Sequence, residues 1–293
     1  MKAKKVSIVM ASLCATMMLQ AQVKLSFNPD KGATYSYLSK LEMKGNISAA
    51  GQEIPMNTSM DILYAMKVTE KSGSEVSVDY LYKELAMSMQ TPMGAINYNS
   101  KNSSLMNLSE PEKLISQIIG GLIDKTLNVV LNADGSVKSV SGFQEIMAEI
   151  QKNTPPAAQA MTTPLLQSFN DEAIKKSFEQ SFNFYPKNTV KTGDSWTGEY
   201  SFDMAGITCD IQNTYTLNSV KDNTAVISVT SVVSMKQFAG GLSGDQTGEI
   251  TVDLKTGMPK SSMMTQTIKG KLNQQGVEAS MDMVSKMTMS LQK

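Results

Sequence analysis

Residues 54–68, IPMNTSMDILYAMKV, alternate apolar and polar side chains with a period of two. The even positions of this stretch are Ile54, Met56, Thr58, Met60, Ile62, Tyr64, Met66 and Val68, whereas the odd positions are mostly polar. Such alternation is typical of a β-strand that buries one face. The stretch therefore predicts a long strand in an antiparallel sheet that has one face in water.

The same alternation recurs along the chain, in residues 33–47, 207–217, 250–254 and 281–291. Turn sequences separate these segments, among them Asp134-Gly135 and Thr256-Gly257. Short turns between alternating segments favour hairpins, so we expect roughly ten antiparallel strands.

Three helices are expected between the strands. One begins at Ser109, whose spacing to Glu112 matches a capping box, and the others cover about residues 143–151 and 165–182. About forty residues of helix are too few to cover a flat sheet of this size. We therefore expect an α+β fold that is mostly antiparallel β, with a long curled sheet (a half-barrel or open barrel) and about three helices covering its apolar face. Such a sheet can enclose a cavity.

The first 21 residues have the composition of a secretory signal peptide. Lys2, Lys4 and Lys5 precede an apolar run, and Ala21 places a small residue before the expected cut at Gln22. The alternative is a lipoprotein signal at Cys14, but this residue follows a leucine, where lipid attachment requires a small side chain. We expect export through a cleaved signal peptide to the periplasm or the extracellular space.

The mature chain, residues 22–293, is expected to form a single curled-sheet domain. The alternative is two pseudo-repeated lobes, residues 22–150 and 165–293, joined by a Pro-rich linker at 152–164. The turn at Gly135 resembles the turn at Gly257, which favours a duplication, but hairpins of one sheet also reuse turn chemistry.

The composition excludes several kinds of function. The chain has 27 Lys but no Arg and no His, so it cannot hold a Ser-His-Asp triad, a histidine zinc site or an arginine clamp. Removing the signal leaves 24 Lys against 27 Asp and Glu, a net charge of −3 that disfavours binding to nucleic acid. No later stretch reaches the roughly 18 apolar residues of a transmembrane helix. We expect no enzymatic activity, no cofactor, no nucleic-acid partner and no transmembrane segment. The sequence does not identify any protein partner.

Methionine is unusually frequent, with 23 residues of which 19 follow the signal. Two strand faces carry the candidate ligand-lining residues: Met56, Met60, Ile62, Met66, Met281, Met283, Met287 and Met289. One interpretation is that Met replaces Leu and Ile in a filled core. Another is that flexible thioethers form an adaptable wall around an apolar ligand. A third is a thioether site for Cu(I), although strand alternation explains the Met-x-Met spacings without a metal.

Two single residues allow further expectations. Cys209 alternates with Ile207 and Ile211, so its thiol is expected to be buried and unreactive. Trp196 follows a Gly193-Asp194 turn at a strand start and is interpreted as a structural anchor, with contact to a ligand as the alternative.

Five motifs together resemble a known family. They are the signal ending Leu19-Gln20-Ala21-Gln22, the opening Lys31-Gly32-x-x-Tyr35, the hairpin Asp134-Gly135, the element Gly193-Asp194-Ser195-Trp196 and the hairpin Thr256-Gly257. With these motifs the chain resembles an uncharacterised secreted family of Bacteroides-type bacteria, a domain of unknown function. The resemblance covers nearly all of the mature chain and implies no activity or site. The expected architecture is also loosely similar to the half-barrels of periplasmic lipoprotein carriers, which hold acyl chains.

Two functional hypotheses remain. The first is a non-enzymatic exported envelope protein that binds an apolar small molecule or a lipid in a curled-sheet cavity. The alternative is a structural or protein-interaction module of the cell envelope, with a filled Met-rich core and no ligand. A cavity against the apolar face distinguishes the two.

Overall fold

The computed structural model describes residues 22–49, 51–91, 94–102, 109, 112–113, 116, 118, 120–154, 171–204, 207–235, 241–274 and 277–293. Within these residues the chain forms one 12-stranded antiparallel sheet and two α-helices. The expected signal segment, residues 1–21, lies outside the described residues. The expected class, mostly antiparallel β, is confirmed.

The strands of the sheet are long, and several exceed fifteen residues because the period-two patterning continues across them. Their bounds are β1 (Thr34–Ala49), β2 (Gln52–Ser72), β3 (Glu75–Thr91), β4 (Gly94–Asn99), β5 (Thr126–Asn132), β6 (Val137–Ser141), β7 (Ser195–Met204), β8 (Ile207–Lys221), β9 (Thr224–Met235), β10 (Leu242–Asp253), β11 (Pro259–Gln274) and β12 (Val277–Gln292).

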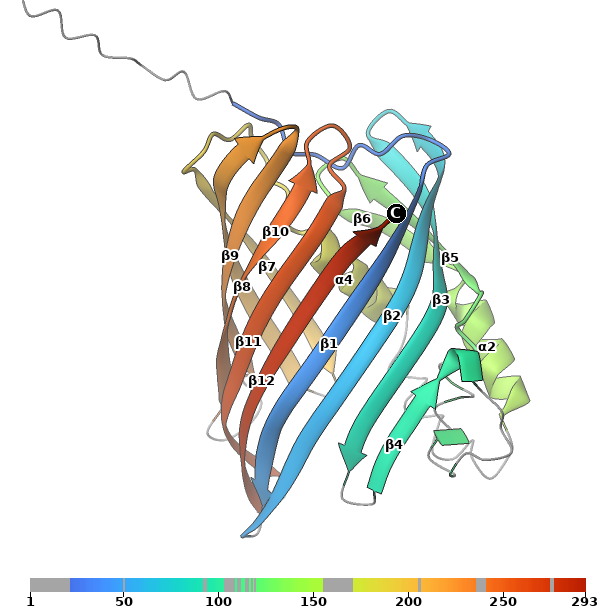
Figure 1. Ribbon diagram of the computed structural model, residues 1–293, viewed down its shortest axis with the longest axis vertical. Helices are drawn as coiled ribbons and strands as arrows, with labels where there is room; N and C mark the ends of the chain where they lie inside the picture. The colour runs from blue at the N-terminus through green and yellow to red at the C-terminus, as the bar shows by residue number, and fades with distance from the viewer. Residues whose placement is uncertain are drawn as a thin grey trace, which may run out of the picture.

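The strand order is β6-β5-β3-β2-β1-β12-β11-β10-β9-β8-β7, so the first long strand pairs with the last (Figure 1). The register of that pair sets Tyr37 opposite Leu291 and Ile47 opposite Met281. Beside β3, strand β5 pairs with one half and β4 with the other. The sheet remains open, because its edge strands β6 and β7 do not pair with each other in the described residues.

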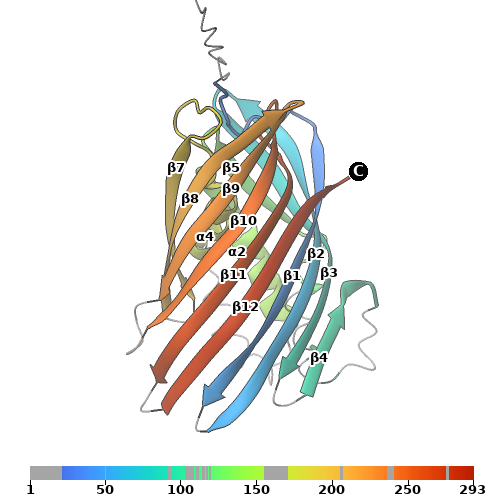
Figure 2. The ribbon, with the colours of Figure 1, turned by 60° about the vertical axis from the view of Figure 1, so that its left-hand side comes forward.

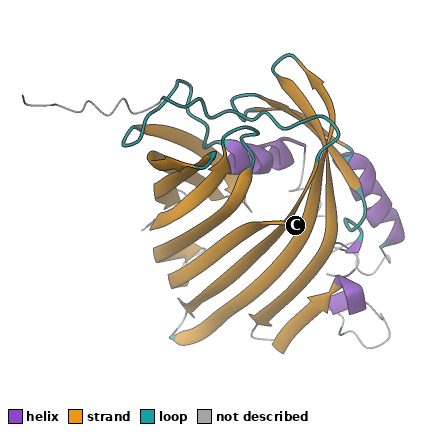
Figure 3. Ribbon diagram, turned by 45° about the horizontal axis from the view of Figure 1, so that its top comes forward, coloured by secondary structure: helices purple, strands orange, loops and turns teal. Residues whose placement is uncertain are grey.

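The sheet is strongly curled around one face, as two further views show (Figure 2, Figure 3). Inward-facing glycines accompany this curvature. A Cβ atom at Gly248 of β10 would overlap the carbonyl oxygen of Met263, and one at Gly45 of β1 would overlap the carbonyl oxygen of Asp282. Only a residue without a side chain allows neighbouring strands to approach so closely on the concave face.

Two α-helices are present in the described residues, α2 (Phe143–Asn153) and α4 (Asp171–Phe182), together with a short 3-10 helix η1 (Ser100–Asn102). Helix α4 packs against both β6 and β7, so it bridges the two edges of the open sheet. Helix α2 buries one face, formed by Phe143, Ile146, Met147 and Ile150.

The helices differ in detail from the expectation of three. The helix expected from Ser109 is described in part: Glu112, Lys113, Ser116, Ile118 and Gly120 are helical, and residues 110, 111, 114, 115, 117 and 119 lie outside the described part. Helix α2 extends to Asn153 and so takes up the first residues of the expected linker, while residues 155–170 lie outside the described part. No helix within the described residues has the length and hydropathy needed to cross a membrane.

The main core lies at the end of the curl that carries the β2–β3, β5–β6 and β10–β11 turns, called the upper end here (top of Figure 1). Residues 22–33, the N-terminal strap, cross this end and bury Leu25 and Phe27 in the core. The strap backbone bonds to three distant segments, through Val23 to Val190, Phe27 to Ala133 and Asn28 to Thr256.

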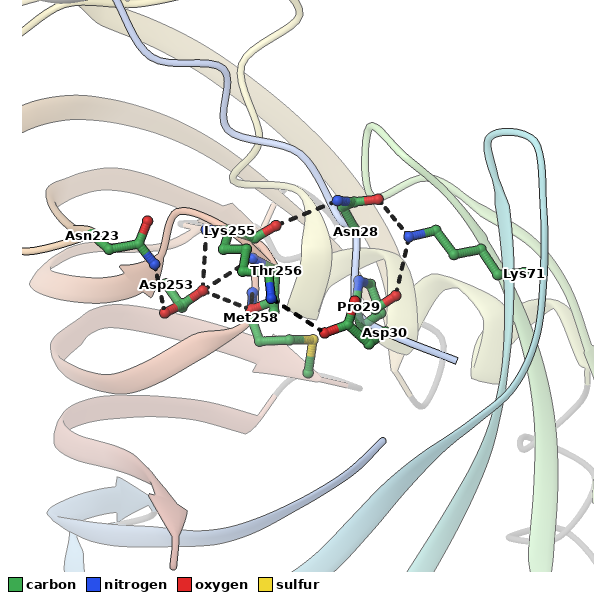
Figure 4. Close-up of polar contacts among 9 residues, drawn as sticks. All are labelled: Asn28, Pro29, Asp30, Lys71, Asn223, Asp253, Lys255, Thr256 and Met258. Carbon is green, nitrogen blue, oxygen red and sulfur yellow. Dashed lines mark hydrogen bonds and ion pairs between the residues drawn. The ribbon is translucent and has the colours of Figure 1, made fainter. Parts of the chain in front are cut away.

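Side chains reinforce the strap, as a close-up shows (Figure 4). Lys71 of β2 donates hydrogen bonds to the Asn28 side chain at 2.6 Å and to the Pro29 carbonyl at 3.2 Å. Asn28 in turn donates to the Lys255 carbonyl in the β10–β11 turn at 3.3 Å. These bonds link the strap to strands from both halves of the chain across the upper end.

Candidate ligand-binding site

An apolar pocket of about 370 Å³ lies between the concave face of the sheet and the helices. We call it the aromatic pocket. Strands β2, β3 and β5 form its wall on the sheet side with Ile62, Tyr64, Met66, Tyr80, Tyr82, Leu85 and Leu127. The remaining lining residues come from residues 118–123 and the two helices: Ile118, Leu122, Ile123, Phe143, Met147, Ile174, Ser177, Phe178, Ser181 and Phe182.

Stacked tyrosines build the floor of the aromatic pocket. Tyr64 stacks on Tyr37 of β1 with ring centroids 5.4 Å apart and on Tyr80 of β3 with centroids 4.9 Å apart. Tyr80 also meets Phe178 of α4 edge to face, with centroids 5.0 Å apart. A β-bulge at Leu63 and Tyr64 shifts the register so that these rings from separate strands share one face.

No charged residue lines the aromatic pocket among the described residues that form it. Burial raises the pKa of the Tyr80 and Tyr82 hydroxyls above their usual value, so both groups stay neutral at physiological pH. The polar atoms of the lining are therefore uncharged hydroxyls. This chemistry suits an uncharged apolar guest and offers no ion pair to an anion or a cation.

The structure places all eight predicted ligand-lining residues on the concave face, since they occupy alternate, half-buried or buried positions of β2 and β12. Ile62 and Met66 line the aromatic pocket. Three others sit lower on the same face, in cross-strand rows with β1: Met60 and Met287 both pair with Leu41, and Met56 flanks Gly45. On β12, Met283 also pairs with Gly45, and Met281 pairs with Ile47 one row lower. Met289 receives a hydrogen bond from Tyr64.

Several pocket residues were not among the predicted set, above all Tyr64, Tyr80, Tyr82 and Phe178. Their sequence signal is the period-two pair Tyr80-x-Tyr82 and the even position of Tyr64 in the opening stretch. That signal predicts a buried face but does not tell which buried side chains border an open space.

Trp196 is held by contacts with its neighbours, and Cys209 is buried. The Trp196 indole donates a hydrogen bond to the Phe184 carbonyl at 3.0 Å and stacks on Tyr215, with centroids 5.8 Å apart. Trp196 also borders a second cavity, of about 760 Å³, whose lining includes charged residues such as Asp134 and Glu199. Cys209 is 3% exposed, which confirms the expected burial of its thiol.

These features define a class of protein: an open, curled antiparallel sheet with an apolar pocket under two helices, one of which bridges its edges. Residues 73–259, more than half of the chain, match the family of unknown function DUF6263, and the chain belongs to that family. No curated protein matches the chain.

Three solved structures show low similarity. Lipovitellin, in a structure of its lipid–protein interactions, is 10% identical with a TM-score of 0.47, covering 91% of this chain and 25% of that one. An outer membrane channel from Pseudomonas putida F1 is 8% identical with a TM-score of 0.23, covering 91% and 98%. A DUF1329 family protein from Desulfovibrio piger is 10% identical with a TM-score of 0.15, covering 84% and 83%. The chain spans about a quarter of the lipovitellin chain, and these scores carry no argument about function.

Proposed function

We propose that this protein is a non-enzymatic exported envelope protein that binds an apolar small molecule or a lipid inside its curled sheet. The observation that carries the proposal is the aromatic pocket, whose volume of about 370 Å³ lies in the range of small-molecule sites and whose lining is uncharged. A well-packed core contains few voids larger than a water molecule. A module with a filled core would therefore not be expected to contain a cavity of this size.

The position of α4 supports entry of a ligand from solvent. Ser177 and Ser181 of this helix border the aromatic pocket and are themselves exposed. A neighbouring helical residue, Ile174, is half-buried and also faces the pocket. An apolar guest can therefore lie against the tyrosine floor without unfolding of the sheet.

The test uses protein purified without detergent. Native mass spectrometry detects bound molecules, and extraction with an organic solvent then releases them for identification. We expect substoichiometric apolar molecules in the wild type. Ile174→Gln places an amide against the pocket at a cost of about 1–3 kcal/mol, so bound ligand should fall about tenfold. Lys175→Gln is the matched control, because Lys175 lies on the same helix in a surface ion pair with Glu179, at 3.7 Å, that contributes little.

An empty wild-type extract would overturn the proposal if N-phenyl-1-naphthylamine, an apolar fluorescent probe, also fails to bind at tens of micromolar, about −6 kcal/mol. That pair of results would favour the structural or protein-interaction module with a filled core. If bound ligand fell equally in Lys175→Gln and Ile174→Gln while both variants kept the unfolding midpoint of the wild type, the aromatic pocket would not be the site.

Export to the periplasm or the extracellular space, and the secreted Bacteroides-type character suggested by the sequence motifs, belong to the same proposal. Intact-mass measurement of the product from the native host tests it. A mature chain that begins at Gln22 supports cleavage of the signal, whereas a diacylglyceryl group on Cys14 would establish a lipoprotein instead.

A further inference from the structure

A row of uncharged polar side chains crosses the concave face below the aromatic pocket. The strand register places its members opposite one another from β8 to β2, with only Met43 of β1 interrupting them. The members of this polar row are Asn213, Ser231, Gln246, Gln266, Ser285 and Thr58. The rest of the concave face is mostly apolar, with serines such as Ser39 and Ser262 as exceptions, and the alternation of the strands does not require six polar residues to align on one row.

One end of the polar row is satisfied internally. Asn213 and Ser231 are 5% and 4% exposed. The Ser231 hydroxyl donates a hydrogen bond to the Asn213 side-chain oxygen at 2.6 Å, and the Asn213 amide donates to the Tyr215 hydroxyl at 2.9 Å. These groups are paired and stabilise the fold by themselves.

The other end of the polar row is not satisfied. The Thr58 hydroxyl oxygen is fully buried and has no hydrogen-bond partner among the described residues. An unpaired buried hydroxyl costs free energy, and native proteins keep few of them. Between the two ends, Gln246 and Gln266 contribute half-buried amides, which both donate and accept hydrogen bonds.

Apolar side chains border the polar row on both sides. The row toward the upper end contains Met60, Leu41, Met287, Met264 and Val229. The row toward the lower end contains Met56, Met283, Ile268 and Val233. The concave face thus has a polar band between two apolar bands.

Charged residues of the same strands point to the opposite, convex face. There they form cross-strand ion pairs, such as Lys40 with Asp61 at 2.7 Å and Lys269 with Asp282 at 2.9 Å. Among the described residues of these strands, no lysine therefore lies beside the polar row to neutralise the carboxylate of a bound fatty acid. Burial of an unpaired carboxylate is far more costly than burial of an ester or amide that finds hydrogen bonds.

We propose that the polar row binds the uncharged hydrogen-bonding group of an amphiphile, an ester, amide or alcohol flanked by hydrocarbon. This inference rests on the proposed function and names the ligand class for the same concave face. Thr58 lies four residues along β2 from Ile62 of the aromatic pocket, a separation of about 13 Å at the rise of a strand. One hydrocarbon arm of such a ligand reaches the aromatic pocket from the row, and the Thr58 hydroxyl gains its missing partner.

The experiment compares three probes in displacement of N-phenyl-1-naphthylamine at neutral pH. Octyl octanoate carries a central ester, palmitate is the anion of the isomeric palmitic acid, and heptadecane is the hydrocarbon with the same number of chain atoms. We expect octyl octanoate to bind about tenfold more tightly than either of the others. Equal affinity of heptadecane, or stronger binding of palmitate, would overturn the inference while leaving the proposed function intact.

Two variants separate recognition from folding. Thr58→Val keeps the shape of the side chain and removes its hydroxyl, so octyl octanoate should bind about fivefold more weakly, as expected for the loss of one hydrogen bond, with heptadecane unchanged. Ser59→Ala, at the adjacent exposed position, should change neither affinity. An unchanged octyl octanoate affinity in Thr58→Val would contradict the assignment of this hydroxyl. If neither the fluorescent probe nor any of the three compounds binds, the proposed function itself fails.

Discussion

The Tyr64 hydroxyl on β2 donates a hydrogen bond to the Met289 sulfur on β12 at 3.1 Å, across the intervening strand β1. Strands two positions apart in a sheet are separated by about 10 Å at the backbone. The bond therefore runs over the concave side of β1, where the curl brings inward side chains together. It joins a predicted ligand-wall residue, Met289, to the floor of the aromatic pocket.

Removal of this hydrogen bond should show a measurable energetic coupling between Tyr64 and Met289. Tyr64→Phe keeps the ring stacks with Tyr37 and Tyr80 and removes only the hydroxyl. We expect a loss of about 0.5–1.5 kcal/mol in the free energy of unfolding, measured in urea. A double-mutant cycle with Met289→Leu should give a coupling of about 0.5 kcal/mol. Strict additivity of the two substitutions would show that the bond contributes nothing.

The sequence predicts β2 and its buried face well, because side-chain direction in a strand depends only on odd or even position. It does not predict which buried residues meet in the pocket. The bulge at Leu63 and Tyr64 sets Tyr64 opposite Tyr82, and a single chain gives no local signal for that shift. The sequence does not predict the polar row for the same reason. Thr58 and Gln266 belong to one row only because of the register of the four strands β2, β1, β12 and β11.

The contacts of the helices are also only partly predictable from the sequence. The amphipathic pattern predicts that α4 has an apolar face, and Phe178 lies on it. The pattern does not predict that this helix contacts both edge strands, β6 and β7, because those contacts depend on how far the sheet curls. Inward glycines such as Gly248 accompany the curl, and the close approach of the neighbouring backbone to them is visible only in the structure.

Gly248→Ala should be strongly destabilising. The added methyl would overlap the Met263 carbonyl oxygen and the Met264 sulfur, so two strands must move apart on the concave face. We expect a loss of about 1–3 kcal/mol, the usual cost of overpacking, measured as a lower midpoint of urea unfolding. Thr247→Ala, at the adjacent exposed position, is the control and should stay within about 0.5 kcal/mol of wild type. Equal stability of the two variants would mean that the curl does not require a glycine there.

Cys209 should react with a thiol reagent only when the protein opens. Its thiol is 3% exposed, and burial, with a contribution from Asp210, raises its pKa, so little thiolate is present at neutral pH. We expect labelling by Ellman's reagent to be at least about a hundredfold slower in the native state than in denaturant, in line with protection of a core strand. In Ser59→Cys, which offers an exposed thiol, the added cysteine should react within the mixing time. Rapid labelling of native Cys209 would contradict the assigned strand phase of β8.

The stability of the protein should fall steeply in alkaline solution, because buried tyrosines must ionise when the sheet unfolds. Burial raises the pKa of Tyr215 from 10.0 to about 12, and it raises those of Tyr37 and Tyr64 further. A group with a raised pKa in the folded state gives its full stabilisation below the unfolded value, near pH 10, and loses it as the pH rises through the folded value. Between pH 10 and 12 each such tyrosine should lower the free energy of unfolding by about 1.4 kcal/mol per pH unit.

Tyr215→Phe isolates one of these contributions. The variant loses the hydrogen bond from Asn213 at every pH, which lowers its stability by about 1 kcal/mol near neutrality. Its decline between pH 10 and 12 should nevertheless be shallower than that of the wild type by about 1.4 kcal/mol per pH unit, since one fewer proton is released on unfolding. Urea unfolding at intervals of pH measures both slopes, and lysine ionisation cancels in the difference because both proteins carry the same lysines. Parallel curves would show that Tyr215 ionises as readily in the folded protein as in the unfolded chain.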